Sequence, residues 1–368
     1  MFKKLEGVDL VPEYKHNKAN LYALNAPKLN NKYYIVTSAS TRRLLNSPEV
    51  VGFENYDCMC NPTKVVLDYF NKQGLINQAN ILTILRGGLN YPLEESCFRV
   101  GIPVNDMSFL SCERVFEGEL ITGLDIKYKK LSIINKGTLI IGDIIATGDT
   151  LVKCLKYVVK EYRSVGAALR NIVFFTIGGN MGITVLENLT EELREYWPEF
   201  EGFYCVYHEG IFSTYKEKGV TGINLPFVDF YWKDSVLAPE YRERTLSDDD
   251  ALFEKCTIYD GGARRYEIPE HYKEVVEYWE GLDKIADKVD FAAFTDEKFG
   301  YEGKISYEEW LEITHYKKLE GYETMALYEQ EMAYRDANKK RTLKEITTRR
   351  LAEFKAAVGP LVDKIVKE

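Results

Sequence analysis

Short apolar runs alternate with amphipathic segments along the middle of the chain, and this alternation constrains the fold more than any other sequence feature. Residues 81–85 and 138–141 are continuous apolar runs of strand length, which is typical of strands covered on both faces. After the second run, Leu151, Leu155 and Val158 recur at helical spacing. Strands that alternate with helices predict parallel βαβ units, so we expect an α/β fold with a parallel sheet and helices on both faces.

The same alternation sets the expected domain boundaries. It continues through a strand, a helix and a strand at residues 172–177, 184–195 and 203–207. We therefore expect an α/β core over residues 61–240, whose first helix begins at Asn61 and Pro62, a capping residue followed by a first-turn proline. Residues 1–60 are expected to form an N-terminal extension with one strand-like patch at 33–36.

A helical region is expected over residues 241–368. Its apolar residues recur at helical spacing, and Tyr272, Val275 and Trp279 share one face. Pro360 follows a glycine and is expected to interrupt the last helix. This pattern predicts an α-helical appendage to the α/β core.

Charge is distributed unevenly over the chain. The whole sequence has a net charge of −9, residues 241–330 have −11 and residues 331–368 have +4. We expect these opposite charges to pair within the chain or with a second subunit. The overall acidity argues against a nucleic-acid partner, because neutralising phosphates takes a basic face.

Composition also bounds the compartment. No stretch approaches the roughly 20 apolar residues that a membrane helix needs, and residues 1–10 lack the apolar core of a signal peptide. Seven cysteines in a chain of 368 residues without an export signal are typical of reduced thiols. We therefore expect a cytoplasmic protein with no membrane partner.

The clearest chemistry lies in residues 138–151 (TLIIGDIIATGDTL). Asp143 stands just beyond the carboxyl end of a strand, where α/β sheets bind ligands. The helix that follows offers free backbone N–H groups for a phosphate, and Gly148 lets the backbone approach it closely. Because a carboxylate repels phosphate, Asp143 is expected to bind sugar hydroxyls or a magnesium ion. The segment predicts a site for a 5′-phosphorylated ribose.

This segment resembles the phosphoribosyl-pyrophosphate (PRPP) motif of type I phosphoribosyltransferases. In that motif, apolar and acidic residues precede (A/T)-T-G-x-(T/S). The resemblance assigns PRPP binding to Asp143, Ala146, Thr147, Gly148, Asp149 (through its amide) and Thr150. It also implies that Mg²⁺ is the cofactor and that Asp143 is both a magnesium ligand and a catalytic residue. The family usually has a second acid, or an acid at the first place, where this chain has Gly142.

A second loop, Arg86-Gly87-Gly88, follows the strand at residues 81–85 and so lies at the same edge of the sheet. Its glycines leave backbone N–H groups accessible and its arginine adds a planar cation, a combination that fits a pyrophosphate. It resembles the pyrophosphate loop of the same family and is nearest to the uracil phosphoribosyltransferase branch. The resemblance implies that Arg86 acts in catalysis by stabilising the departing pyrophosphate.

Two more segments bear on the site. Residues 111–136 resemble the mobile loop that closes over the site in this family. Phe227, Asp229 and Tyr231 could stack on a planar base and accept an N–H group, and are equally consistent with an edge strand that packs onto the helical region.

The expected function is transfer of the 5-phosphoribosyl group of PRPP to a nucleobase or similar nitrogen acceptor, with release of pyrophosphate. A dimer is usual for the family. Two other classes stay open. A non-catalytic PRPP or nucleotide sensor would bind PRPP without releasing pyrophosphate, and an interaction protein would keep its ligand binding after deletion of residues 241–368.

Overall fold

The structure is a computed structural model, and it describes residue 5 and residues 7–117, 120–225, 229–255 and 262–365. The strands in these ranges form one sheet in the order β1-β2-β3-β9-β8-β7-β4-β5-β6, and β10 pairs with β9. The central strands run parallel: β3 (Lys32–Thr37), β9 (Phe203–Ser213), β8 (Leu169–Gly179), β7 (Gly137–Gly142), β4 (Ala79–Leu85) and β5 (Val104–Glu117). The expected α/β fold with a mostly parallel sheet is confirmed.

Both edges of the sheet are antiparallel. At one edge, β1 (Asp9–His16) and β2 (Ala19–Asn25) continue from β3, so the N-terminal residues contribute more strands than the sequence analysis expected. At the other edge, β5 and β6 (Leu120–Lys130) form a hairpin, so most of the segment expected as a loop over residues 111–136 is β-structure. Edge strands carry polar residues on a solvated face, which makes them hard to recognise from sequence.

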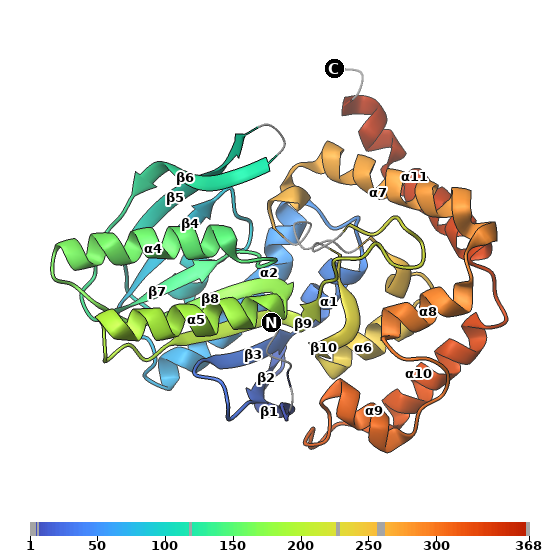
Figure 1. Cartoon of the computed structure of the whole chain (residues 1–368), viewed down its shortest axis with the longest axis horizontal. Helices are drawn as coiled ribbons and strands as arrows, with labels where there is room; N and C mark the ends of the chain where they lie inside the picture. Colours follow the sequence, from blue (N-terminus) through green and yellow to red (C-terminus); the bar gives the residue numbers. More distant parts are fainter. Residues whose placement is uncertain (1–4, 6, 118–119, 226–228, 256–261, 366–368) are drawn as a thin grey trace.

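Helices cover the two faces of the sheet. α2 (Gly52–Lys72) and α3 (Leu93–Arg99) pack on one face, whereas α4 (Asp149–Ser164) and α5 (Met181–Tyr196) cover the other and lie in front of the sheet in Figure 1. Alternation along the strands serves both faces: Ile140 packs with the α2 side, and Ile141 packs with the α4 side. The helices predicted on both faces are therefore confirmed.

The first predicted helix exists, but its predicted start is wrong. α2 begins at Gly52, and Asn61 and Pro62 lie in its interior, so the boundary expected at residue 60 falls inside this helix. An interior proline costs a backbone hydrogen bond, which is why the sequence indicated a helix start there. The fully buried Met59 anchors the earlier turns to the core.

The C-terminal region is helical, as expected. Its α-helices are α6 (Pro239–Leu246), α7 (Ile268–Ile285), α8 (Phe291–Phe299), α9 (Tyr307–Thr314), α10 (Thr324–Asn338) and α11 (Leu343–Ile365). α11 continues through Gly359 and Pro360, so the expected interruption there is wrong. Among the described helices, none is both long and apolar enough to cross a bilayer.

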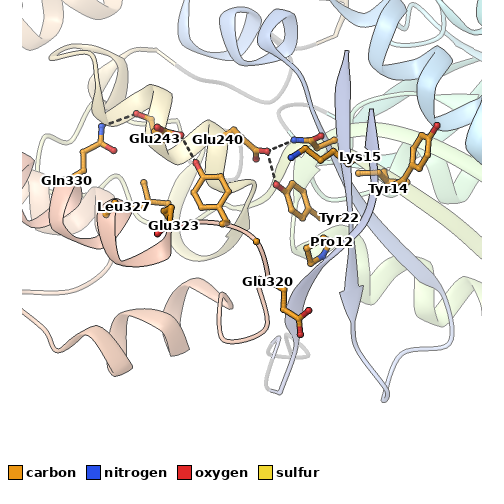
Figure 2. Close-up of a pocket in the computed structure, with 15 residues that line it drawn as sticks. Pro12, Tyr14, Lys15, Tyr22, Glu240, Glu243, Glu320, Glu323, Leu327 and Gln330 are labelled. Carbon is orange, nitrogen blue, oxygen red and sulfur yellow. Dashed lines mark hydrogen bonds between the residues drawn. The ribbon is translucent and has the colours of Figure 1, made fainter. Parts of the chain in front are cut away.

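The helical region meets the N-terminal strands along a polar seam. A cavity of about 470 Å³ lies there, between β1, β2 and the helices α6 and α10 (Figure 2). Glu240 of α6 accepts hydrogen bonds from Asn20 Nδ2 and from the Tyr22 hydroxyl of β2, each at 2.7 Å. These contacts tie the first helix of the C-terminal region to the edge of the sheet.

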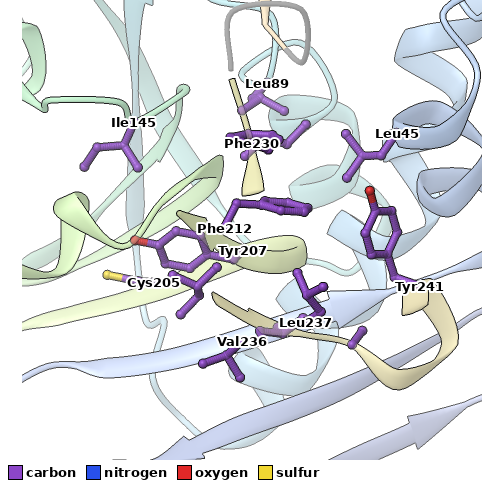
Figure 3. Close-up of a cluster of buried hydrophobic side chains, with 14 of the residues drawn as sticks. Leu45, Leu89, Ile145, Cys205, Tyr207, Phe212, Phe230, Val236, Leu237 and Tyr241 are labelled. Atoms are coloured by element: carbon purple, nitrogen blue, oxygen red, sulfur yellow. The ribbon is translucent and has the colours of Figure 1, made fainter. Parts of the chain in front are cut away.

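The two parts of the chain also share an apolar core. α1 (Ala39–Asn46), β9, β10 (Tyr231–Leu237) and α6 contribute to one cluster around Phe212 (Figure 3). Phe230 stacks on Phe212 with ring centroids 4.2 Å apart, and Tyr241 contacts the same ring edge-on at 5.6 Å. The C-terminal region is therefore continuous with the core of the α/β part.

The opposite charges of the C-terminal region pair within the chain. Cations of α11 reach acidic residues of the preceding segments, in the pairs Arg349–Asp250, Arg350–Glu254, Lys344–Asp283 and Lys355–Glu280. Internal pairing was one of the two arrangements expected from the sequence, and these contacts confirm it.

Two ion pairs in this region are buried, Arg350–Glu254 and Arg242–Glu331, and the second is the less exposed. Arg242 of α6 donates to Glu331 of α10 at 2.5 Å, and neither side chain is more than 5% exposed. Arg242→Met is expected to lower the free energy of unfolding by about 3–5 kcal/mol, because it leaves a buried carboxylate without its cation. Urea unfolding measures this loss.

The exposed pair between Lys355 and Glu280 provides the control for Arg242→Met. Lys355→Met should cost less than about 1 kcal/mol, because that pair is solvated. Equal losses in the two variants would contradict the larger effect expected for the buried pair.

Candidate active site

The loop after β7 places Asp143 at the carboxyl edge of the sheet. Its backbone N–H donates to the carbonyl of Phe175 at 3.1 Å, which continues the pairing of β7 with β8 by one residue. The side chain is half-buried, and its Oδ1 accepts the N–H of Ile144 at 2.9 Å. Desolvation raises the pKa of the Asp143 carboxyl to about 7.

Gly148 starts the helix that would hold a phosphate. It has φ +84°, and a Cβ at this position would lie 2.9 Å from Val185, so only glycine fits without strain. α4 begins at Asp149 with no side-chain hydrogen bond capping its first turn. The N–H groups of this turn are therefore available to an anion, and the helix dipole favours one.

The loop after β4 is held close to two backbone segments. Gly87 has φ +39°, and a Cβ on it would lie 2.8 Å from the carbonyl oxygen of Ile84. A Cβ on Gly88 would lie 2.6 Å from the carbonyl carbon of Gly262, a residue of the C-terminal region. The Leu85–Arg86 peptide bond is cis. The glycines of this loop are thus required by close backbone packing on both sides.

These loops open into one cavity of about 1020 Å³. It is lined by residues 84–87, by residues 143–153 without Ile145, by Lys156 and Cys112, and by Gly262, Ala263, Arg264 and Glu267. All the residues assigned from sequence to PRPP and pyrophosphate line this cavity except Gly88, which packs against Gly262. The structure therefore brings two loops far apart in sequence to one hollow.

The C-terminal region supplies one wall of the cavity. Glu267 forms an ion pair with Arg86, whose side chain is 78% exposed, and also accepts a hydrogen bond from Arg264 at 2.6 Å. Arg264 in turn contacts Glu274 at 3.2 Å. The guanidinium of Arg86, which was expected to bind pyrophosphate, is thus paired with the carboxylate of Glu267.

Neither this wall nor the lysines of α4 were among the site residues predicted from the sequence. Lys153 and Lys156 add positive charge to the cavity along with Arg86 and Arg264. Gly262 and Ala263 are followed by an arginine, the same combination of glycine and cation that singled out the loop at residues 86–88. This local pattern could have indicated the wall from the sequence.

Gly142 stands where the motif that this segment resembles usually has an acid, and the structure gives a steric reason for the glycine. A Cβ at this position would lie 2.4 Å from the carbonyl oxygen of Leu89 and 2.8 Å from the backbone nitrogen of Asn90. Backbone atoms cannot move aside as a flexible side chain can. The loop after β4 therefore crosses β7 so closely that no side chain fits.

The residues expected to contact a base lie elsewhere. Asp229 is buried and accepts the N–H of Leu225 at 2.6 Å, and the buried Tyr231 hydroxyl accepts the amide N–H of Asn224. Neither lines the cavity. Phe227 is outside the described residues. The structure thus places Asp229 and Tyr231 in the packing around β10, the alternative that the sequence analysis kept open.

The donor set fits a magnesium ion that arrives with its ligand. Within the described ranges, no group of three or more His, Cys, Asp or Glu side chains could hold a metal. Mg²⁺ usually keeps several waters and binds one or two carboxylates together with substrate phosphates. The half-buried carboxylate of Asp143, which lines the cavity, fits that single-carboxylate role.

Comparison with known proteins gives matches among solved structures. Neither a protein-family model nor a curated protein matches the sequence. A hypoxanthine phosphoribosyltransferase from Staphylococcus aureus is 17% identical, with a TM-score of 0.27, over 43% of this chain and 76% of the other. The matches include phosphoribosyltransferases.

Two further structures match at similar levels. The AQ2163 protein from Aquifex aeolicus is 17% identical with a TM-score of 0.32, and the match covers 46% of this chain and 82% of that protein. A hypothetical protein from Neisseria gonorrhoeae with bound ppGpp is 12% identical with a TM-score of 0.25, over 33% and 67% of the two chains. Each match spans less than half of this chain.

Proposed function

We propose that this protein is a magnesium-dependent phosphoribosyltransferase, which transfers the 5-phosphoribosyl group of PRPP to a nitrogen acceptor and releases pyrophosphate. One observation carries the proposal. A single cavity combines the uncapped start of α4, the carboxylate of Asp143 and the guanidinium of Arg86. These groups suit a phosphate, ribose hydroxyls and a pyrophosphate, which are the three parts of PRPP.

Different residues around the cavity bind different parts of PRPP. The N–H groups of Gly148, Asp149 and Thr150, with the hydroxyls of Thr147 and Thr150, bind the 5′-phosphate. Asp143 accepts hydrogen bonds from the ribose hydroxyls. Arg86 and the Gly87 amide bind pyrophosphate, and Lys153 and Lys156 add to the positive field that attracts the polyanion.

The reaction breaks the bond between C1 of the ribose and the pyrophosphate oxygen, forms the bond to the acceptor nitrogen, and releases a proton from that nitrogen. C1 becomes cation-like on the way. The carboxylate of Asp143 stabilises that positive charge, and Arg86 stabilises the negative charge that develops on pyrophosphate. Bound Mg²⁺ would neutralise part of the pyrophosphate charge.

A pyrophosphate-release assay with PRPP, Mg²⁺ and a panel of bases tests the proposal. The panel includes uracil, because Arg86-Gly87-Gly88 resembles the uracil branch, and the purines hypoxanthine and guanine. Release that depends on one base supports a transferase and names the acceptor. Size-exclusion chromatography tests the dimer that the resemblance implies.

A non-catalytic PRPP or nucleotide sensor is the second candidate, and two observations favour it. The chain has one acid at the ribose position because Gly142 excludes a second, and Glu267 pairs with the arginine assigned to pyrophosphate. A sensor would bind PRPP in calorimetry and release no pyrophosphate with any base of the panel.

The ion pair between Glu267 and Arg86 leads to a prediction that applies to either candidate function. Glu267→Gln is expected to tighten binding of inorganic pyrophosphate about five- to tenfold, because Arg86 no longer has to leave a carboxylate before it binds the anion. Isothermal titration calorimetry measures the change.

Glu270→Gln is the matched control, because it makes the same charge change on the exposed side of the first turn of α7. Its affinity should stay within about twofold of the unchanged protein. An equal gain in both variants would mean that general charge, and not release of Arg86, sets the affinity.

A further inference from the structure

Two cysteines are in contact beside the cavity, and one of them lines it. Cys112 lies on β5 and Cys154 lies on α4, and their Sγ atoms are 3.2 Å apart. Cys112 follows a shift in the pairing of β5 with β6, where Ser111 and Cys112 are out of regular register. Such irregularities re-aim a side chain, and here the side chain reaches the helix that covers the sheet.

The two thiols differ in access. Cys112 lines the cavity and is partly exposed, whereas Cys154 is completely buried. A small oxidant that enters the cavity therefore meets Cys112 first, and Cys154 already stands in contact as the second thiol. A partly exposed cysteine with a resolving cysteine beside it is the usual arrangement of a redox-sensitive pair.

The other cysteines lack this arrangement. Among the six described cysteines, only Cys112 and Cys154 have sulfur atoms in contact with each other. Cys60, which is also partly exposed, has its Sγ atom at 3.4 Å from the carbonyl oxygen of Tyr56 within its own helix. The pair at the cavity is thus distinguished by geometry and not by the number of cysteines.

We propose that Cys112 and Cys154 are a modification site, which hydrogen peroxide converts to a reversible disulfide. The Cys112 thiolate attacks the peroxide: an S–O bond forms, the O–O bond breaks, and water leaves after protonation. The sulfur of Cys154 then attacks the sulfenic acid of Cys112, so that an S–S bond forms and a second water leaves. Two electrons pass from the two thiols to the peroxide, and a dithiol reverses the step by exchange.

The disulfide would alter the cavity. An S–S bond is about 2.05 Å long, so the two sulfur atoms must approach by roughly 1 Å, which rotates both side chains and shifts the contact between β5 and α4. α4 is the helix whose first turn is assigned to the 5′-phosphate. On the proposed function, the oxidised protein should release pyrophosphate at least about tenfold more slowly, because small displacements of positioning groups cost large factors in rate.

Non-reducing peptide mapping of the full-length protein tests the site itself. The protein is treated with hydrogen peroxide, its remaining thiols are alkylated, and the digest is analysed by mass spectrometry. We expect a peptide that links Cys112 to Cys154, the loss of two thiols per chain, and recovery of both thiols with dithiothreitol.

Three variants sharpen the result. Cys154→Ser should stop the reaction at a sulfenic acid on Cys112, which dimedone labels, and Cys112→Ser should abolish the linked peptide. Cys60→Ser is the control and should leave the linked peptide unchanged. Recovery of Cys112 and Cys154 as separate alkylated peptides after excess peroxide, or a link from either to another cysteine, overturns the proposal.

The activity assay distinguishes this proposal from the proposed function. A linked peptide in a protein that never releases pyrophosphate would refute the transferase and leave the modification site standing. An active enzyme without the linked peptide would do the reverse.

Discussion

Asp143→Asn is expected to slow pyrophosphate release by about a hundredfold or more while the protein stays folded. Asparagine keeps the shape of the side chain and can still accept the N–H of Ile144, so the loop should survive. On the proposed function it removes the negative charge next to the sugar carbon that becomes cation-like, and electrostatic groups of this kind typically contribute factors of about 10²–10³. Steady-state assay with saturating PRPP and the best base of the panel measures the loss.

The same residue predicts a pH dependence. The pKa of Asp143 is raised to about 7 by desolvation, so the carboxylate that we propose binds ribose or Mg²⁺ forms only as the pH rises through about 7. Activity of the unchanged protein should therefore increase over that range, and this increase should disappear in Asp143→Asn.

The contribution of Asp143 to the free energy of unfolding should decrease over the pH range in which activity increases. In the unfolded chain this carboxyl ionises near 3.8, so the folded state holds the extra proton between about 3.8 and about 7. Stability contributed by Asp143 is thus present at low pH and is lost as the pH rises through this window. Asp143→Asn should accordingly gain stability relative to the unchanged protein at pH 8 more than at pH 5, as urea unfolding at the two values would show.

Asp125→Asn is the control for these measurements, because Asp125 is an exposed residue of β6 that forms an ion pair with Lys127 at 3.2 Å. Its activity should match the unchanged protein at every pH. Turnover within about twofold of the unchanged protein in Asp143→Asn would remove Asp143 from the mechanism.

Gly142→Asp is expected to destabilise the fold by more than about 3 kcal/mol and not to supply the second acid of the motif that residues 138–151 resemble. Even the first carbon of a side chain would overlap the backbone of Leu89 and Asn90. Overpacking of this kind typically costs about 1–3 kcal/mol, and a carboxylate buried without a partner adds to that cost. Urea unfolding measures the loss, and Gly142→Ala isolates the steric part.

Gly281→Asp gives the matched comparison, since a Cβ on Gly281 meets nothing within 4 Å. The same substitution there should change stability by less than about 1 kcal/mol. A stable Gly142→Asp protein with faster turnover would contradict this prediction. It would show that the loop after β4 can move away from β7 and that a second acid fits at this position.

The central fold could be predicted because its signals are local. The buried run at residues 138–141 and the helical spacing of Leu151 and Leu155 specify β7 and α4 without help from the rest of the chain. β1 could not be recognised in the same way, since it is an edge strand with Pro12 and a mostly polar, partly exposed face. α2 shows the limit of capping signals, because burial of Met59 outweighs the cost of an interior proline.

The candidate site was predictable in part for the same reason. Asp143 and Arg86 each follow a recognisable strand, and parallel strands bring their carboxyl ends to one edge. Glu267 reaches Arg86 from a distance of 181 residues along the chain, and nothing in the local sequence around either residue indicates that contact. The thiol pair of Cys112 and Cys154 also depends on how β5 and α4 pack, which no spacing along the chain expresses.

The close backbone approach of Gly88 to Gly262 bears on how this protein can be divided. A fragment that ends at residue 240 would lack the wall formed by Gly262, Arg264 and Glu267, and it would expose the apolar surface around Phe212 that α6 covers. Such a fragment should therefore bind PRPP poorly and aggregate. The segment at residues 262–267 therefore forms one wall of the candidate site, and removing it would open the cavity to solvent on that side.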